Sequence, residues 1–199
     1  MTFDKMIPLP SPERSGQVPL ETTLAERRSV RLYIKTPLSL REVSQMLWAV
    51  QGISYQNNRR TSPSAGATYP LEIYVVIQNV ENIDPGIYHY LIDKHAIELF
   101  QVGRFEESLK QAAWGQDFID SAGMSIIIGA VYTRTTTRYG ERGYRYVHME
   151  AGHVGQNIYL QATALGLGTV AVGAFHDQQV RHLLGIDEEV LYIFPVGKI

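Results

Sequence analysis

The chain has 199 residues, of which 45% are hydrophobic and 19% are charged, with a formal net charge of -2. It contains no cysteine, which excludes disulfide scaffolds, thiolate nucleophiles, cysteine-ligated zinc and cysteine-held iron–sulfur clusters. A chain of this length is most simply one domain, and it holds no apolar run near the roughly 20 residues that a membrane-spanning helix needs.

We predict an extended arm at residues 1–19, followed by one domain at residues 20–199. Pro8, Pro10 and Pro12 recur in the arm, which lacks the apolar segment of a signal peptide, so we expect a cytoplasmic protein. Residues 1–75 carry nine Lys and Arg against six Asp and Glu, whereas the remaining residues carry nine against fourteen. A near-neutral chain does not favour nucleic-acid binding, and its clustered arginines indicate a site for one small anion.

Two capping boxes predict helix starts. The segment Thr23-Leu24-Ala25-Glu26 predicts a helix from about Leu24, and Ser39-Leu40-Arg41-Glu42 repeats the pattern. An apolar stripe follows the second box and ends at Gly52, which is typical of an amphipathic helix of about three turns.

The remaining elements alternate between apolar strands and short helices. The longest helix is predicted at residues 144–165, where apolar residues recur at steps of three and four before Gly166. Its glycines Gly152 and Gly155 indicate close approach, either at a helix crossing between two subunits or by packing within one. The mixed order predicts the α+β class. The other predicted elements are a strand at 71–77, a hairpin at 86–91 and 96–100, a helix at 105–113, strands at 124–131, 169–174 and 190–196, and a helix at 178–184.

Several catalytic motifs are absent from the sequence. There is no P-loop, no nucleophile elbow and no zinc-protease motif, and Gly166, Gly168 and Gly173 do not have the spacing of a dinucleotide-binding fingerprint. Glu150 and His153 have the Glu-x-x-His spacing of di-iron helices, but the chain has no second pair. We therefore expect an ordinary helix face there and no metal site.

Three segments contain candidate binding residues. Arg27-Arg28-Ser29-Val30-Arg31 offers guanidinium forks and a hydroxyl that suit a phosphomonoester, although it also fits a solvated basic loop. The small residues of Pro63-Ser64-Ala65-Gly66 allow a flat ligand to approach the backbone, as does an ordinary loop. The run from Ala164 to Phe175 leaves backbone N–H groups accessible at Gly173 and Ala174, or forms a packed helix-to-strand turn.

In this order and spacing the three segments resemble the nitroreductase-like flavin oxidoreductases, from about Leu20 to Lys198. The PSAG loop, the Tyr-Gly-Glu-Arg-Gly-Tyr-Arg segment and the Glu-Ala-Gly-His-Val-Gly-Gln-Asn helix look most like the SagB-type dehydrogenase branch. The resemblance implies a mostly antiparallel sheet flanked by helices, an intertwined homodimer, and FMN bound at the subunit interface. It also implies that NAD(P)H, as electron donor, stacks on the exposed flavin face.

The resemblance also implies a role for each matching residue. Arg27, Arg28 and Ser29 would face the FMN phosphate, and Arg31 the N1/O2 edge of the ring. Lys198 is a further phosphate candidate. The remaining cofactor-binding candidates are Pro63, Ser64, Ala65 and Gly66 from the partner subunit, with Val172, Gly173 and Ala174 near N5 and O4.

One pair departs from the family pattern. Azoline-oxidising members carry a Lys-Tyr pair where this chain has Arg138-Tyr139, and a guanidinium is not a neutral base at pH 7. Tyr69, Arg138 and Tyr139 are therefore only substrate-side candidates, and no catalytic residue is assigned because the reactive atom belongs to the flavin. Residues 132–146 are interpreted as a mobile lid, with a nucleic-acid surface as the alternative.

The predicted function is NAD(P)H-driven two-electron reduction of nitro, quinone or similar small acceptors, with ping-pong hydride transfer at flavin N5. Two alternatives stay open: a SagB-like FMN dehydrogenase of azoline or other organic substrates, and a non-enzymatic flavin-binding protein.

Overall fold

The computed structural model describes residues 6–55 and 59–199, and the first five residues of the predicted arm lie outside this range. The described residues form one seven-stranded sheet with strand order β1-β6-β5-β4-β7-β9-β8, antiparallel throughout, and a small β2-β3 sheet. The strands are β1 (Met6–Pro8), β2 (Ile53–Tyr55), β3 (Arg59–Arg60), β4 (Leu71–Ile77), β5 (Gly86–Leu91), β6 (Ala96–Val102), β7 (Met124–Ala130), β8 (Leu167–Thr169) and β9 (Glu189–Lys198). The α-helices are α1 (Leu20–Glu26), α2 (Leu40–Gln51), α3 (Glu106–Ala112), α4 (Thr133–Tyr139), α5 (Arg142–Ala164) and α6 (Asp177–Leu184).

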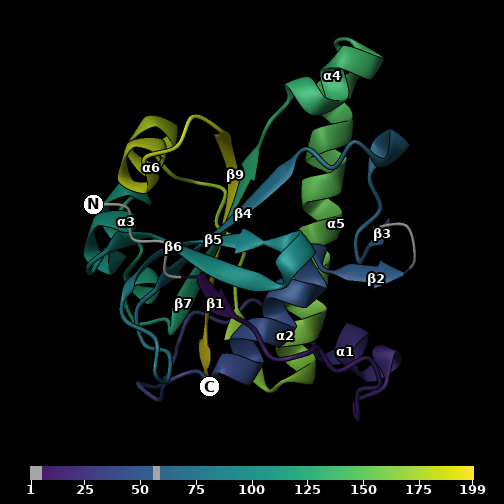
Figure 1. Cartoon of the computed structure of the whole chain (residues 1–199). Coiled ribbons are helices and arrows are strands. Elements are labelled where there is room, and N and C mark those ends of the chain that lie inside the picture. Colours follow the sequence, from purple (N-terminus) through teal and green to yellow (C-terminus); the bar gives the residue numbers. More distant parts are fainter. Residues whose placement is uncertain (1–5, 56–58) are drawn as a thin grey trace.

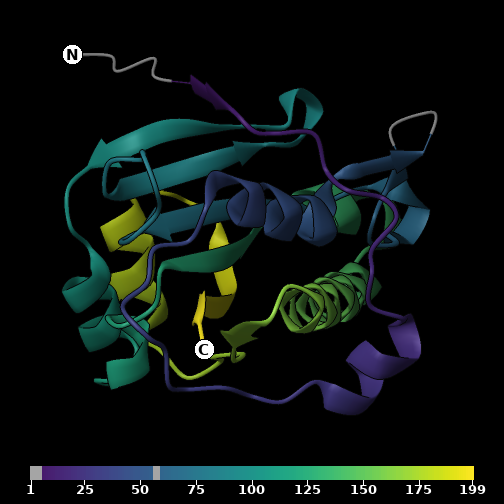
Figure 2. The same cartoon turned by 90° about the horizontal axis from the view of Figure 1, so that it is seen from below.

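Helices cover both faces of the large sheet (Figures 1 and 2). Ile73, Val75 and Ile77 of β4 pack in the cluster that α2 and α5 share, whereas Tyr74 and Val76 pack in the cluster with α3 and α6. Alternate side chains of a strand point to opposite faces, so a mainly apolar strand is expected to be buried on both faces. The structure confirms this prediction for β7, which is buried along its whole length.

Most predicted elements are confirmed, including the Ser39–Glu42 capping box, in which the Ser39 hydroxyl accepts from the Glu42 N–H at 3.3 Å. The first predicted box is wrong. Helix α1 begins at Leu20, directly after Pro19, and ends at Glu26, and the Thr23 hydroxyl donates to the Leu20 carbonyl at 2.7 Å. The arginines that follow therefore lie beyond the end of α1.

One other prediction needs correction. The strand expected at residues 169–174 is mostly absent, because β8 ends at Thr169 and only Val172 forms a bridge, to Ile193. Residues 132–146 form α4 and the start of α5, and their interpretation as a mobile lid stays a prediction. The division into an arm and a domain stays a prediction, although β1 of the arm pairs with β6.

No helix in the described part of the chain is long and apolar enough to cross a membrane. The cytoplasmic location stays a prediction.

Candidate functional site

Tyr159 of α5 joins two of the three predicted segments. Its hydroxyl lies 2.9 Å from Ser29 Oγ and accepts a hydrogen bond from the Ala171 N–H at 2.8 Å. The Arg27 guanidinium lies over the Tyr159 ring, 5.0 Å from its centroid, in a cation–π contact. One side chain therefore holds the arginine-rich segment against the segment that leads to Gly173.

Backbone contacts fix the same arrangement. The Val30 N–H donates to the Thr169 carbonyl, and the Ile34 N–H to the Lys198 carbonyl, each at 2.9 Å. A Cβ on Gly168 would lie 2.8 Å from Val30 Cγ1, so only glycine permits this approach. Residues 27–34 thus run along the edge of the sheet formed by β8 and the end of β9.

The cationic side chains of this region differ in their partners. Lys198 Nζ lies 2.5 Å from a carboxylate oxygen of Glu42. Burial opposes ionisation of Glu42, but Lys198 and the Ser39 groups lower its pKa overall. By contrast, Arg27, Arg28 and Arg31 pair with no carboxylate in residues 6–55 and 59–199. Three arginines are available to an anion, whereas Lys198 is already neutralised.

The chain leaves the sheet edge after Val172. Val172 exchanges hydrogen bonds with Ile193 at 2.8 and 3.1 Å, and the Ala174 carbonyl accepts from Gln116 Nε2 at 3.1 Å. Gly173 and Ala174 are exposed, and their N–H groups donate to no acceptor in the part of the chain that the structure describes. Two adjacent backbone donors therefore point to an external acceptor.

The loop at residues 63–66 gathers the substrate-side candidates. Ser64 Oγ accepts from the Tyr69 N–H at 2.9 Å, and Arg138 Nη1 donates to the Gly66 carbonyl at 3.2 Å. Gly66 has φ +61°, and a Cβ there would lie 2.5 Å from the Tyr139 hydroxyl. This close approach explains the glycine, and it brings Tyr69, Arg138 and Tyr139 to one loop.

A buried carboxyl lies behind that loop. Glu150 is 2% exposed and accepts from Gln51 Nε2 at 3.3 Å. Burial raises the pKa of Glu150, although Ser64, Gln51 and Arg60 oppose the shift. His153 is exposed one turn further on, and no group of three potential metal ligands was found among the described residues.

The two groups of candidates contact different parts of α5: the Pro63–Gly66 loop lies near Glu150, whereas Ser29 and Ala171 bond to Tyr159. Tyr159 follows Glu150 by nine residues, which is a rise of roughly 13 Å along the helix. Within residues 6–55 and 59–199, no contact joins the Pro63–Gly66 loop to Arg27, Ser29 or Gly173.

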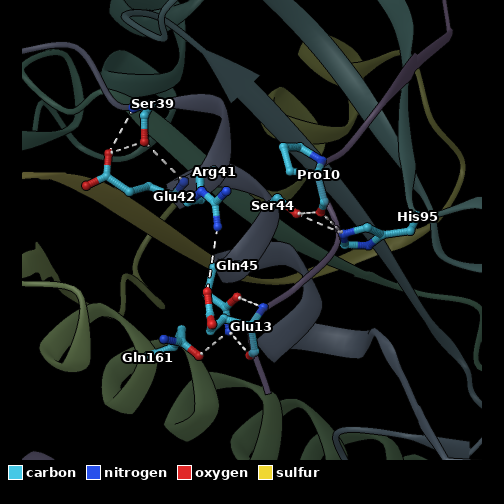
Figure 3. Close-up of polar contacts among 9 residues, drawn as sticks. All are labelled: Pro10, Glu13, Ser39, Arg41, Glu42, Ser44, Gln45, His95 and Gln161. Carbon is cyan, nitrogen blue, oxygen red and sulfur yellow. Dashed lines mark hydrogen bonds and ion pairs between the residues drawn. The ribbon is translucent and has the colours of Figure 1, made fainter. Parts of the chain in front are cut away.

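A cavity lies elsewhere in the described part of the chain. It has a volume of about 740 Å³ and is lined by the arm, α2 and α5, including Gln45, Trp48 and Gln161, but by none of the predicted cofactor residues. Gln45 closes one wall, because its amide exchanges hydrogen bonds with the Glu13 backbone at 2.8 and 3.0 Å (Figure 3).

Sequence reasoning missed three residues of the site. Tyr159, Phe118 below the Arg31 guanidinium at 5.9 Å, and Gln116 all contact predicted cofactor residues. Only Tyr159 had a signal in the sequence, because it directly follows Ile158 of the apolar stripe of α5.

Comparisons with known proteins agree with this fold. Residues 24–198 match the Nitroreductase family. A protein of Methanocaldococcus jannaschii, provisionally named a nitroreductase, is 50% identical over 182 residues, covering 92% of both chains. A structure from Anabaena variabilis, with the same provisional name, has a TM-score of 0.87 at 30% identity, over 98% of this chain and 42% of that one.

A further relative is named for the processing of microcin B17. The Escherichia coli microcin B17-processing protein McbC is 26% identical over 163 residues, 79% of this chain and 60% of McbC. The structure of the microcin synthetase McbBCD complex has a TM-score of 0.75 at 25% identity, over 89% of this chain and 72% of the matched chain. The chain thus spans less than two thirds of McbC and of the Anabaena protein.

This chain belongs to the nitroreductase family, and the fold is nitroreductase-like. The similarity to McbC supports the SagB-type branch. Family membership makes the protein an oxidoreductase.

Proposed function

We propose that the protein is an FMN-dependent oxidoreductase that takes hydride from NAD(P)H and reduces nitro, quinone or similar small acceptors. The observation that carries the proposal is the contact of Tyr159 with both Ser29 and Ala171. It holds on neighbouring segments three arginines and two backbone N–H groups that have no carboxylate partner and no acceptor, respectively, among the described residues. This donor set suits a phosphate joined to a flat, hydrogen-bonding ring.

The residues present fit FMN in charge and in shape. Arg27, Arg28 and Ser29 supply donors for a phosphomonoester, and the exposed Gly173 carries no side chain to block a ring. Lys198 is the weakest member of the set, because a phosphate would have to compete with Glu42 for its ammonium group.

FMN, when bound, supplies a two-electron centre that accepts and donates hydride at N5. Arg31 would stabilise the negative charge that reduction places at the N1/O2 edge. The backbone around Val172, Gly173 and Ala174 would hold the N5/O4 edge in position by hydrogen bonding. No side chain of this set is required to act as an acid or a base.

The proposed site needs two copies of the chain. The Pro63, Ser64, Ala65 and Gly66 loop makes no contact with Arg27 or Gly173 within the described residues, so we propose that a partner subunit brings this loop to the flavin ring. Exposed Gly152 leaves a flat strip on α5 where helices of two subunits could cross.

A second candidate function is an FMN dehydrogenase of azoline or other organic substrates. Arg138 and Tyr139 favour it, because they lie against Gly66 of the loop that we propose to line the ring. The permanent charge of a guanidinium is the observation that opposes azoline oxidation. A flavin-binding protein without enzymatic activity is the third candidate.

Measurements on the purified protein separate these candidate functions. We expect it to be yellow, to elute as a dimer in light-scattering chromatography, and to bleach anaerobically when NADH or NADPH is added. Bound FMN that neither nucleotide bleaches would favour the dehydrogenase or the non-enzymatic protein. A colourless protein that takes up no added FMN would contradict all three.

A further inference from the structure

The corner formed by α4 and the start of α5 is strongly basic. Residues 133–146 contain Arg134, Arg138, Arg142 and Arg145 but only one acidic residue, Glu141, in a chain whose net charge is -2. These four arginines therefore give the two adjoining helix ends a local positive charge.

Close packing holds these two helix ends together. A Cβ on Gly143 would lie 2.9 Å from the Thr136 backbone, so α4 and α5 touch directly at this glycine. The Tyr139 and Tyr146 rings meet edge to face, with centroids 5.1 Å apart. The arginines before and after the turn thus belong to one rigid corner.

Three of the four arginines have free guanidinium charge. Arg134 pairs with Glu72 and is neutralised. Arg138 donates only to the Gly66 carbonyl and stacks on Tyr139. Arg142 and Arg145 are exposed and make no hydrogen bond or ion pair within residues 6–55 and 59–199.

The positions of Arg142 and Arg145 are unfavourable when no anion is bound. Arg142 and Arg145 are three residues apart on α5, so their side chains share one helix face and repel each other. Both also lie in the first turn of the helix, where the helix dipole disfavours cations. A bound anion would relieve both effects.

We infer that Arg138, Arg142 and Arg145 bind the phosphate groups of the nicotinamide dinucleotide and favour NADPH over NADH. The inference rests on the proposed function. Arg138 contacts the loop that we propose to line the flavin ring, so the corner lies beside the nucleotide's route to that ring. NADPH carries a 2′-phosphate that NADH lacks, and paired guanidinium groups match its oxygens bidentately.

Calorimetric titration of the purified protein with NADP⁺ and with NAD⁺ tests this specificity without any turnover. We expect NADP⁺ to bind at least tenfold more tightly, and the double variant R142A/R145A to lose most of that preference. The variant R142K/R145K keeps the charge without the planar fork and should retain part of it. K94A removes an exposed cation on the β5–β6 connection and serves as the matched control.

Equal affinities in the unmodified protein, or a preference that survives R142A/R145A, would overturn the inference. If inorganic phosphate bound at this corner as tightly as NADP⁺, the corner would be a general anion site, and the nucleotide assignment would be overturned. The visible absorption spectrum of the protein reports separately whether FMN is bound. A protein that prefers NADP⁺ but takes up no FMN would refute the proposed function alone, and a yellow protein without the preference would refute this inference alone.

Discussion

The Tyr159 hydroxyl accepts a hydrogen bond from the Ala171 N–H at 2.8 Å while it lies 2.9 Å from Ser29 Oγ. Because the backbone N–H can only donate, the tyrosine proton is left for Ser29. A single phenol thereby sets the distance between the arginine-rich segment and the Gly173 segment, and its ring supports Arg27.

Replacing Tyr159 with Phe removes this hydroxyl and keeps the ring. We expect FMN affinity to fall by about five- to tenfold, which corresponds to roughly 1 kcal/mol, the net contribution of a typical hydrogen bond. Titration of the FMN-free protein, followed by quenching of flavin fluorescence, measures the change. The control is Tyr88→Phe, which removes a hydroxyl that donates to the Asp84 carbonyl at 2.8 Å on β5. Equal affinities in the two variants would contradict a positioning role for Tyr159.

Arg31→Ala should lower the flavin midpoint potential. In the proposed site the guanidinium favours the reduced, negatively charged ring, and losing about 1 to 2 kcal/mol of that preference corresponds to roughly 20 to 40 mV for a two-electron couple. Equilibration with a reference dye during anaerobic reduction gives the potential. Arg104→Ala removes an exposed arginine that pairs with Glu106 and should leave the potential unchanged. An unaltered midpoint in Arg31→Ala would exclude Arg31 from this role.

Gly155 and Gly152 of α5 should respond oppositely to alanine. A Cβ at Gly155 would lie 2.9 Å from the Phe194 ring, so Gly155→Ala should destabilise the fold by about 1 to 3 kcal/mol through overpacking. At Gly152 nothing lies within 4 Å, and Gly152→Ala should stabilise the isolated subunit by about 0.5 to 1 kcal/mol.

Denaturant unfolding measures both changes, and sedimentation at several concentrations measures the dimer. If helices of two subunits cross at Gly152, Gly152→Ala also weakens association. A Gly155→Ala variant as stable as the unmodified protein would show that Phe194 moves freely out of the way.

The sequence predicts elements well where the local pattern and the tertiary packing agree. Ser39 and Glu42 form the expected capping box. The same spacing at Thr23 fails, because Pro19 already permits a helix start at Leu20 and the Thr23 hydroxyl bonds back to that first turn. A capping motif therefore identifies a helix but does not fix its first residue.

The candidate site was only partly predictable for a different reason. The contact between Ser29 and Tyr159 spans 130 residues and depends on where α5 lies against the sheet, so no local pattern contains it. The pairing of Lys198 with Glu42 is hidden in the same way, over 156 residues. The apolar run after Thr169 has strand composition, but the sheet supplies it with a partner only at Val172.

The surroundings of His95 predict that the free energy of unfolding depends on pH. Its Nδ1 lies 2.8 Å from the Tyr90 hydroxyl, and its Nε2 lies 2.8 Å from Ser44 Oγ and 3.0 Å from the Pro10 carbonyl, which ties the arm to α2 (Figure 3). Burial lowers the pKa of His95 from its usual 6.5, although the Pro10 carbonyl opposes the shift.

Because the unfolded chain binds this proton more readily than the folded one, the contribution of His95 to stability is complete above pH 6.5 and is lost as the pH falls below it. We expect the free energy of unfolding, measured by denaturant titration from pH 7.5 to 5, to decrease. In His95→Gln that decrease should be smaller, because glutamine can donate to Pro10 but does not titrate. His153→Gln changes an exposed histidine and is the control. Parallel pH profiles for the unmodified protein and His95→Gln would show that the arm is held independently of the charge on this ring.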